Sequence, residues 1–159
     1  MNPIDSDDFR EMMLRLIVAT VIGAILGIDR DIHKKPAGLR VLALVSLGAC
    51  LVTVCTILAV SEEGTKPVEA TTRVVQGIIG GIGFLGGGVI LRGARSEEVH
   101  GLTTAASIWI SAGLGTSCGL GQWRVATIGF VLAMMVLWIG NPIEKAIMRR
   151  FGPPDEPKT

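Results

Sequence analysis

The sequence predicts an all-α, polytopic membrane protein, a bundle of about five transmembrane helices followed by a short C-terminal interfacial helix. Three observations predict this fold class: a high mean hydropathy, a small share of charged residues, and long apolar segments separated by short polar connectors. Mean hydropathy is +0.54, and 18% of the residues are charged, against roughly a quarter in soluble domains. The net charge of +1 gives no electrostatic sign of a nucleic-acid partner.

Five apolar segments account for the predicted spans, and they cover residues 16–28, 41–60, 74–91, 102–118 and 125–139. A helix of about 20 apolar residues crosses the hydrocarbon core of a bilayer, so the three middle segments are near the required length. The first and the fifth are shorter. We expect Arg15 to extend the first by snorkelling towards the headgroups, and Trp123 and Trp138 to lie near the interfaces of the fifth.

The C-terminal part of the chain predicts a change of structure after the fifth span. Asn141 and Pro142 favour a helix end, and the segment IEKAIMRRF, residues 143–151, has apolar residues at helical spacing with basic residues between them. This pattern is typical of a helix that lies in the membrane interface. Residues 152–159 have too little apolar surface to fold. We therefore expect one transmembrane domain over residues 1–151 and a disordered tail over residues 152–159.

Basic residues are divided unequally between the two sides of such a bundle, and this division predicts its orientation. Ten lysines and arginines flank the spans on one side and five on the other. Short loops rich in lysine and arginine stay in the cytoplasm. We therefore expect a multi-pass protein with its N-terminus outside and its C-terminus in the cytoplasm. The acidic start, IDSDDF, is unlike the basic start of a signal peptide.

The stretch GIIGGIGFLGGGVI, residues 77–90, contains the spacing G-x-G-x-x-G of dinucleotide-binding loops. Residues 74–91 carry no ionisable side chain, whereas a phosphate site needs charge, water and a preceding strand, so we exclude nucleotide binding. Two interpretations stay open. The glycines allow a neighbouring backbone to approach closely, or the helix breaks where protein or water surrounds it. The residues concerned are Gly77, Gly81, Gly83, Gly86, Gly87 and Gly88.

Charged residues at the ends of the spans are the first candidates for function. Asp29 and Arg30 end the first span, Arg40 opens the second and Arg92 ends the third, all on the predicted cytoplasmic side. A charge near the membrane core is costly unless it is paired or reaches the interface. One hypothesis is that Asp29 pairs with Arg40 or Arg92 and shapes a cytoplasmic vestibule. The alternative is that these residues only anchor the topology in the headgroup zone.

Polar uncharged residues are the second group of candidates. Thr103, Thr104 and Ser107 begin the fourth span, and their hydroxyl groups either cap the helix, bond to a neighbouring helix, or line the vestibule. Gln76, at the outer end of the third span, has no clear role.

Metal, cofactor and catalytic sites are not predicted. No carboxylate lies inside the five segments, and Mg²⁺ is usually held by one or two carboxylates. No C-x-x-C motif occurs among the three cysteines, and no nucleophile, base and orienting group stand at recognisable spacing. The outer acids either contact divalent cations weakly or form a solvated surface; they are Asp5, Asp7, Asp8, Glu62, Glu63 and Glu69.

Several motifs in order resemble one family. GIDR, KKPAGLR, QGIIGGIGFLGGGVI and VHGLTTAASIWISAGLGTSCGLG, at residues 27–30, 34–40, 76–90 and 99–121, are similar to the membrane domain of the MgtC/SapB family. Members are bacterial inner-membrane proteins linked to growth in low magnesium and, in pathogens, to survival inside host cells. This chain departs from them with Asp29 in place of the usual Glu and GFLGGG in place of GFLGAG. Many members also carry a cytoplasmic ACT-like domain, and this sequence ends before it.

The resemblance implies a non-enzymatic protein of the bacterial inner membrane. It implies a role in adaptation to low magnesium or in ion homeostasis, exerted through other membrane proteins. The small-residue helix faces lead us to expect a homodimer or another membrane protein as partner, besides the lipid bilayer. The alternative is a transporter or channel for Mg²⁺ or another small solute, which the glycine triplet and the polar span ends favour.

Overall fold

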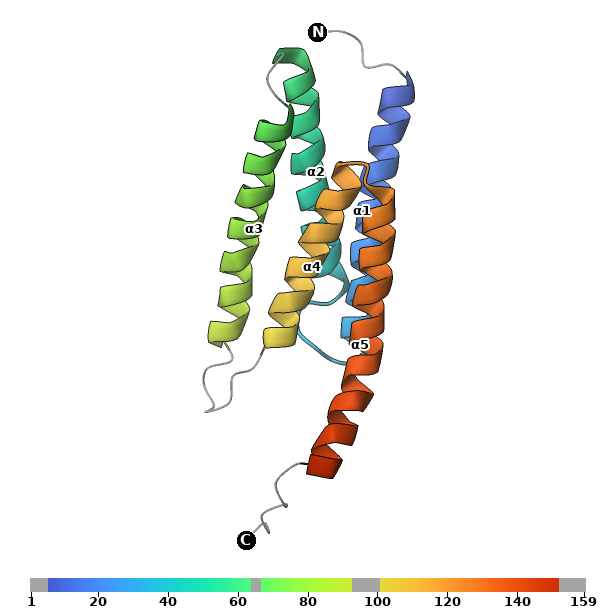
Figure 1. Cartoon of the computed structure of the whole chain (residues 1–159), viewed down its shortest axis with the longest axis vertical. Coiled ribbons are helices and arrows are strands. Elements are labelled where there is room, and N and C mark those ends of the chain that lie inside the picture. Colours follow the sequence, from blue (N-terminus) through green and yellow to red (C-terminus); the bar gives the residue numbers. More distant parts are fainter. Residues whose placement is uncertain (1–5, 64–66, 93–100, 152–159) are drawn as a thin grey trace.

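Five helices make up the computed structural model of the chain, which describes residues 6–63, 67–92 and 101–151. They are α1 (Ser6–Ile32), α2 (Leu39–Glu63), α3 (Pro67–Arg92), α4 (Leu102–Gly119) and α5 (Trp123–Phe151). The helices alternate in direction and lie lengthwise in a bundle (Figure 1). No strand occurs in the described residues, and the predicted all-α class is confirmed. The predicted tail, residues 152–159, lies outside them.

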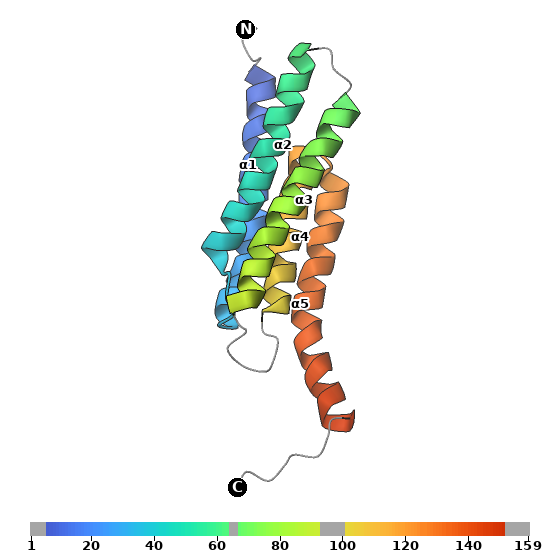
Figure 2. The same cartoon turned by 90° about the vertical axis from the view of Figure 1, so that its left-hand side faces the viewer.

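Four of the helices are long and apolar enough to cross a membrane. The spanning segments within α1, α2, α3 and α5 are Asp8–Ile32, Leu39–Val60, Val68–Ile90 and Trp123–Gly140. The fourth predicted span is the exception, because the 18 residues of α4 mix apolar residues with serine, threonine and glycine. It nevertheless occupies the centre of the bundle and packs against each of the other four helices, as Figures 1 and 2 show from two sides.

Small residues let α1, α2 and α4 approach one another closely. A Cβ atom added to Gly23 of α1 would lie 2.5 Å from the carbonyl oxygen of Leu42 in α2. One added to Gly119 of α4 would lie 2.7 Å from Cβ of Thr53, and one added to Gly115 would overlap the carbonyl group of Ser46. Helix association in lipid depends on such close packing. These three helices therefore form the tightly packed part of the bundle.

α3 lies at the edge of the bundle, apart from α1 (Figure 1). It is one continuous helix, so the predicted break at the glycine triplet is wrong; an unbroken helix satisfies its own backbone hydrogen bonds in lipid. Only Gly86 meets a neighbour, with 3.4 Å between its added Cβ and that of Ala105. Added Cβ atoms meet nothing within 4 Å at Gly77, Gly80, Gly81, Gly83, Gly87 and Gly88. Within the part of the chain that the structure describes, close packing at these glycines is therefore confined to Gly86.

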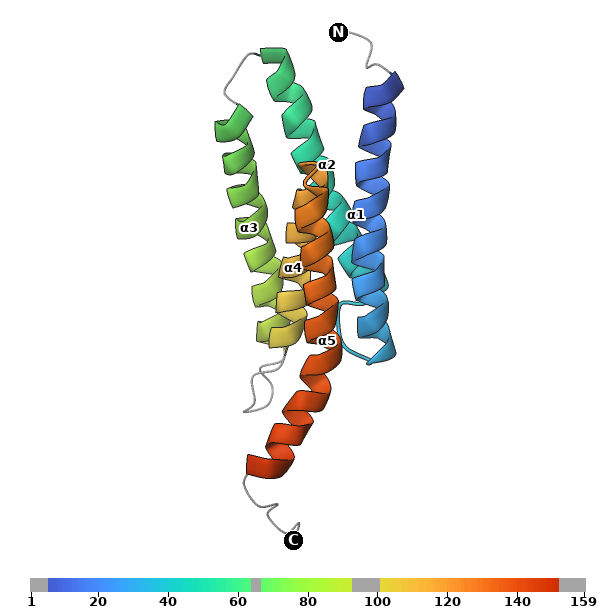
Figure 3. The same cartoon turned by 45° about the vertical axis from the view of Figure 1, so that its right-hand side comes forward.

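α5 continues through Asn141 and Pro142 to Phe151. The predicted helix end at Asn141 is therefore wrong, although residues 143–151 are helical as expected. A proline inside a helix removes one backbone hydrogen bond and favours a bend there, but the helix can continue beyond it. Figure 3 shows the last, red turns of α5 slanting away from its orange part. The predicted interfacial helix is the continuation of the fifth span.

Candidate functional site

The end of the bundle where α1 finishes and α2 starts carries Arg30, Lys34, Lys35 and Arg40, and we call it the basic end. A cluster of polar side chains is buried there between α1 and α4. Arg30 is 3% exposed and Thr104 is 2% exposed, and Asp29 and Ser107 are also buried. The structure thus gathers four of the predicted site residues in one place, which we call the Arg30 cluster.

Arg30 connects two helices that are far apart in sequence. Its Nη2 atom donates a hydrogen bond to the hydroxyl oxygen of Thr104, 74 positions along the chain. Its Nε atom is buried and has no hydrogen-bond partner among the described residues. The guanidinium group keeps its charge in proteins, and a buried charge without partners is costly. The adjacent carboxylate of Asp29 supplies the opposite charge, and the open N–H group leaves capacity for one more acceptor.

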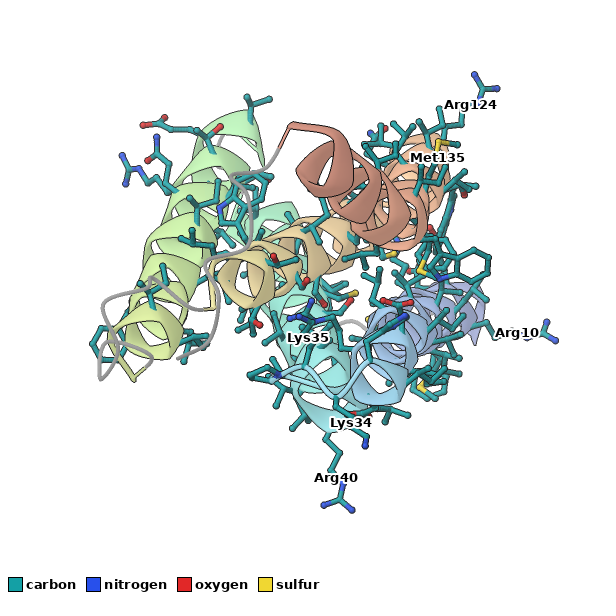
Figure 4. The ribbon with its side chains drawn as sticks, turned by 90° about the horizontal axis from the view of Figure 1, so that it is seen from below. Arg10, Lys34, Lys35, Arg40, Arg124 and Met135 are labelled. Carbon is teal, nitrogen blue, oxygen red and sulfur yellow. The ribbon has the colours of Figure 1, made fainter. Side chains whose placement is uncertain are left out.

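Asp29 is contacted by a residue of its own helix end, His33. Atom Nδ1 of His33 lies 3.5 Å from Oδ1 of Asp29 and 2.8 Å from the backbone oxygen of Asp29. Arg40 is exposed and points away from the bundle (Figure 4). The predicted pair between Asp29 and Arg40 is therefore wrong, because Arg40 lies on the outer face of α2. The side chain of Arg92 lies outside the described residues.

The turn between α1 and α2 holds the basic end in shape. Oδ2 of Asp31 accepts a hydrogen bond of 3.0 Å from the backbone N–H of Leu39, the first residue of α2. Lys34 and Ala37 have φ angles of 52° and 58°, in the left-handed region. Gly38 packs directly against the carboxylate of Asp31. Sequence reasoning missed Asp31, because a capping residue eight positions before the helix is not a local pattern.

Buried hydroxyl groups continue from the Arg30 cluster into the bundle. Ser111 of α4 donates to the carbonyl oxygen of Leu42 in α2, at 2.8 Å, and Ser46 of α2 donates to that of Ala19 in α1, at 2.7 Å. Ser107 donates to the carbonyl oxygen of Thr103 one turn earlier. Each hydroxyl group thus has a partner, as polar groups in lipid require. These bonds tie α1, α2 and α4 together.

Sequence reasoning missed Ser46 and Ser111, although a signal for Ser111 exists. Thr104, Ser107 and Ser111 stand at positions i, i+3 and i+7, which share one face of a helix. The hydroxyl groups do not cap α4: its N-cap is Gly101, with φ 93° and no capping bond from a side chain. The capping interpretation is therefore wrong.

Two predicted site residues lie apart from the Arg30 cluster. Thr103 is the second residue of α4 but its side chain is exposed, and Gln76 is exposed on α3. Among the outer acids, Glu69 pairs with Arg73 at 3.0 Å, and Asp8 is exposed. The other predicted acids lie outside the described side chains; they are Asp5, Asp7, Glu62 and Glu63.

A second arginine is bound at the opposite end of the bundle. Nη1 of Arg15 donates a hydrogen bond of 2.8 Å to the carbonyl oxygen of Gly119, the last residue of α4. Its Nη2 atom pairs with Glu11. The last carbonyl groups of a helix lack partners within it, and Arg15 supplies one to α4. Its snorkelling towards the headgroups stays a prediction.

The Arg30 cluster suits hydrogen bonding and charge compensation between helices. Its open N–H group can hold a water molecule, a carbonyl oxygen or an anionic oxygen. Across the residues that the structure describes, no group of three His, Cys, Asp or Glu side chains lies close enough together to hold a metal ion.

These observations define a class: an all-helical membrane protein whose central helix binds its neighbours through glycines, hydroxyl groups and a buried arginine. Residues 16–146 match the model of the MgtC family, and the chain belongs to this family.

The chain is similar to several curated proteins. SrpB of Synechococcus elongatus is 38% identical over 136 residues, which cover 82% of this chain and 75% of SrpB. Protein slr0014 of Synechocystis sp. is 43% identical over 130 residues, 82% of this chain and 51% of that protein. MgtC of Salmonella typhimurium is 39% identical over 122 residues, 77% of this chain and 49% of MgtC. The chain thus spans about half the length of the latter two. No solved structure matches it significantly.

Proposed function

We propose that this protein is a non-enzymatic protein of the bacterial inner membrane that supports adaptation to low magnesium by binding other membrane proteins. Membership of the MgtC family supports the location in the membrane. The observation that carries the proposal is the outer face of α3, a glycine-rich surface without a neighbour in the described chain. On this proposal the N-terminus lies outside and the basic end faces the cytoplasm, in keeping with the distribution of lysine and arginine.

The outer face of α3 is suited to another helix. Gly80, Gly83 and Gly87 stand at i, i+3 and i+7, on the side away from α2 and α4, and Gln76 is one turn before Gly80. Phe84 beside them is 83% exposed. Glycines allow two helix axes to approach, and a glutamine side chain can form hydrogen bonds across the contact. The occupant is a second copy of this chain or a helix of another membrane protein.

Co-purification tests this proposal. The full chain is extracted in a mild detergent from cells grown in low magnesium, and bound membrane proteins and the chain's own oligomeric state are measured. We expect Gly83→Leu and Gly87→Leu to lose the partner, because leucine blocks close approach. The matched control is Gly140→Leu in α5, where an added Cβ also meets nothing within 4 Å. Equal recovery of a partner by all variants, or the absence of any partner, contradicts the proposal.

A transporter or channel for Mg²⁺ or another small solute is the second candidate. The buried polar groups from the Arg30 cluster to Ser111 favour it, because intramembrane polar residues often mark ion pathways. However, the hydroxyl groups of Ser107 and Ser111 are bonded to backbone carbonyl groups, and a buried guanidinium repels a divalent cation.

Magnesium entry into proteoliposomes, read with an internal dye, separates the two candidates. The regulator predicts no entry above that of empty liposomes when the protein is folded and inserted. Saturable entry that Arg30→Met or Ser111→Ala changes in rate supports the transporter and overturns the regulator.

A further inference from the structure

An apolar crevice separates α2 and α3 in the half of the bundle nearer the basic end. Its volume is about 380 Å³, and its walls include Leu44 and Gly48 of α2 and Gly81 and Leu85 of α3. Every residue that lines it is apolar. Cβ atoms added to Gly48 or Gly81 meet nothing within 4 Å. The crevice therefore exists because each wall has a glycine where a larger side chain would close the gap.

A crevice of this kind is filled in a membrane, because atoms that line an empty space lose their dispersion contacts. The apolar walls of the crevice disfavour a charged or hydrogen-bonding ligand there. The bilayer supplies acyl chains of the required chemistry, and α3 faces it with none of its spanning window buried. The tail of a lipid molecule is thus the occupant that the walls favour.

A second groove, at the start of α2, supplies the site for a headgroup. Arg40 and Val41 line this groove together with Asp31 and Gly38, and its volume is about 400 Å³. One helical turn further along α2, Leu44 and Val45 line the apolar crevice. Residues four apart share a helix face, so the groove and the crevice follow one side of α2.

The charges of the groove favour an anion. The Arg40 side chain is exposed and forms no hydrogen bond or ion pair with another described residue. Lys34 and Lys35 are exposed at the same end (Figure 4). The N-terminus of α2 adds partial positive charge. The carboxylate of Asp31 opposes an anion, but it already accepts the N–H group of Leu39. Within the groove, Arg40 and the start of α2 thus oppose the single carboxylate of Asp31, and Lys34 and Lys35 add positive charge at the same end of the bundle.

The length of the site matches one lipid leaflet. Arg40 and Gly48 are eight residues apart, which is about 12 Å along a helix. Half of the hydrocarbon core is about 15 Å thick. A phosphate group at Arg40 therefore places the part of an acyl chain nearer the headgroup beside Gly48 and Gly81.

We propose that this side of the bundle binds one anionic phospholipid, with its phosphate group at Arg40 and the start of α2 and one acyl chain in the crevice between α2 and α3. Selectivity comes from the headgroup, because the crevice resembles the bilayer in polarity. Each basic residue near a membrane surface changes the affinity for anionic lipid by about fivefold. The site is separate from the Arg30 cluster and from the outer face of α3.

Native mass spectrometry of the full chain in detergent tests the proposal, with phosphatidylglycerol and phosphatidylcholine of identical acyl chains as probes. We expect one phosphatidylglycerol molecule to be retained at concentrations where phosphatidylcholine is not. Arg40→Gln lowers the affinity for phosphatidylglycerol about fivefold and leaves that for phosphatidylcholine unchanged. Gly48→Leu fills the crevice and weakens the binding of both lipids.

Matched controls keep the outcome decisive. Arg124→Gln removes an exposed arginine at the start of α5 (Figure 4), and Gly140→Leu enlarges a glycine in open space away from the crevice. Both are expected to bind like the wild type. If Gly48→Leu fails to fold, Gly81→Leu tests the opposite wall. Equal retention of the two lipids, or equal losses in Arg40→Gln and Arg124→Gln, overturns the proposal.

Discussion

Gly115→Ala is expected to destabilise the bundle, whereas Gly113→Ala on the same helix is expected to stabilise it. An added Cβ at Gly115 would overlap the carbonyl group of Ser46 and lie 2.9 Å from its Cα atom. At Gly113 it meets nothing within 4 Å. The obstacle at Gly115 is backbone, which cannot rotate away, so α2 and α4 must separate. The two substitutions add the same methyl group to the same helix and differ only in what it meets.

The magnitude follows from three contributions. Overpacking against backbone costs about 3 kcal/mol at its upper end. Separation of the helices weakens the neighbouring bond from Ser111 to Leu42, which contributes about 1 kcal/mol. Alanine gains about 1 kcal/mol of helix propensity over glycine. The net loss for Gly115→Ala is therefore about 3 kcal/mol, and Gly113→Ala gains up to about 1 kcal/mol.

Thermal unfolding in detergent, followed by size-exclusion chromatography of the soluble fraction, measures both variants. At about 2–4 °C per kcal/mol for a chain of this size, we expect Gly115→Ala to melt about 6–12 °C below the wild type and Gly113→Ala slightly above it. Equal melting temperatures for the two variants would refute the packing of α2 against α4 described above.

Two further predictions follow from the buried polar and sulfur groups. Thr104→Val leaves the guanidinium of Arg30 without its acceptor and is expected to lower the unfolding free energy by about 1–3 kcal/mol. The control Thr103→Val, at an exposed side chain, is expected to change the unfolding free energy little. Equal melting temperatures of the two variants would contradict the hydrogen bond between Arg30 and Thr104. In the folded protein in detergent, N-ethylmaleimide, which enters micelles, is expected to modify Cys55 first, because its side chain lies on the outer surface of α2. In SDS it is expected to modify all three thiols, with intact mass as the readout. Modification of the other two as fast as Cys55 would contradict their burial. Those two, fully buried, are Cys50 and Cys118.

Segment length and hydropathy predicted the helices well, because a chain in lipid must satisfy its backbone within each segment. The same reasoning did not identify α4 as the central helix. Its position depends on which glycines of one helix meet the backbone of another, as at Gly115 and Ser46, and one sequence gives no pairing information. It also placed the end of α5 at Asn141, because a proline that bends a helix and one that ends it have the same local pattern.

The candidate site was predicted in part. Asp29, Arg30, Thr104 and Ser107 were selected because polar residues beside apolar segments need partners, and the structure brings these four together. Of the two proposed partners of Asp29, Arg40 was wrong, because His33 lies beside Asp29 and Arg40 points outwards; pairing with Arg92 stays a prediction. The chain between Asp29 and Arg40 passes through two left-handed residues, Lys34 and Ala37, so the direction of Arg40 could not be read from helical spacing. Neither residue is one that favours this conformation.

The central helix is α4, in which serine, threonine and glycine are mixed with the apolar residues, and this has a consequence for biosynthesis. α4 is absent from the helices that qualify as independent spans, and its hydroxyl groups use acceptors on α2 and a donor on α1. α1 and α2 are synthesised before α4, so the surface against which α4 packs is already present when α4 reaches the insertion machinery. A chain interrupted before α2 is complete has no such surface, and α4 fused alone to a reporter is expected to pass through the membrane rather than stop in it. Insertion and folding are thus one event for this helix.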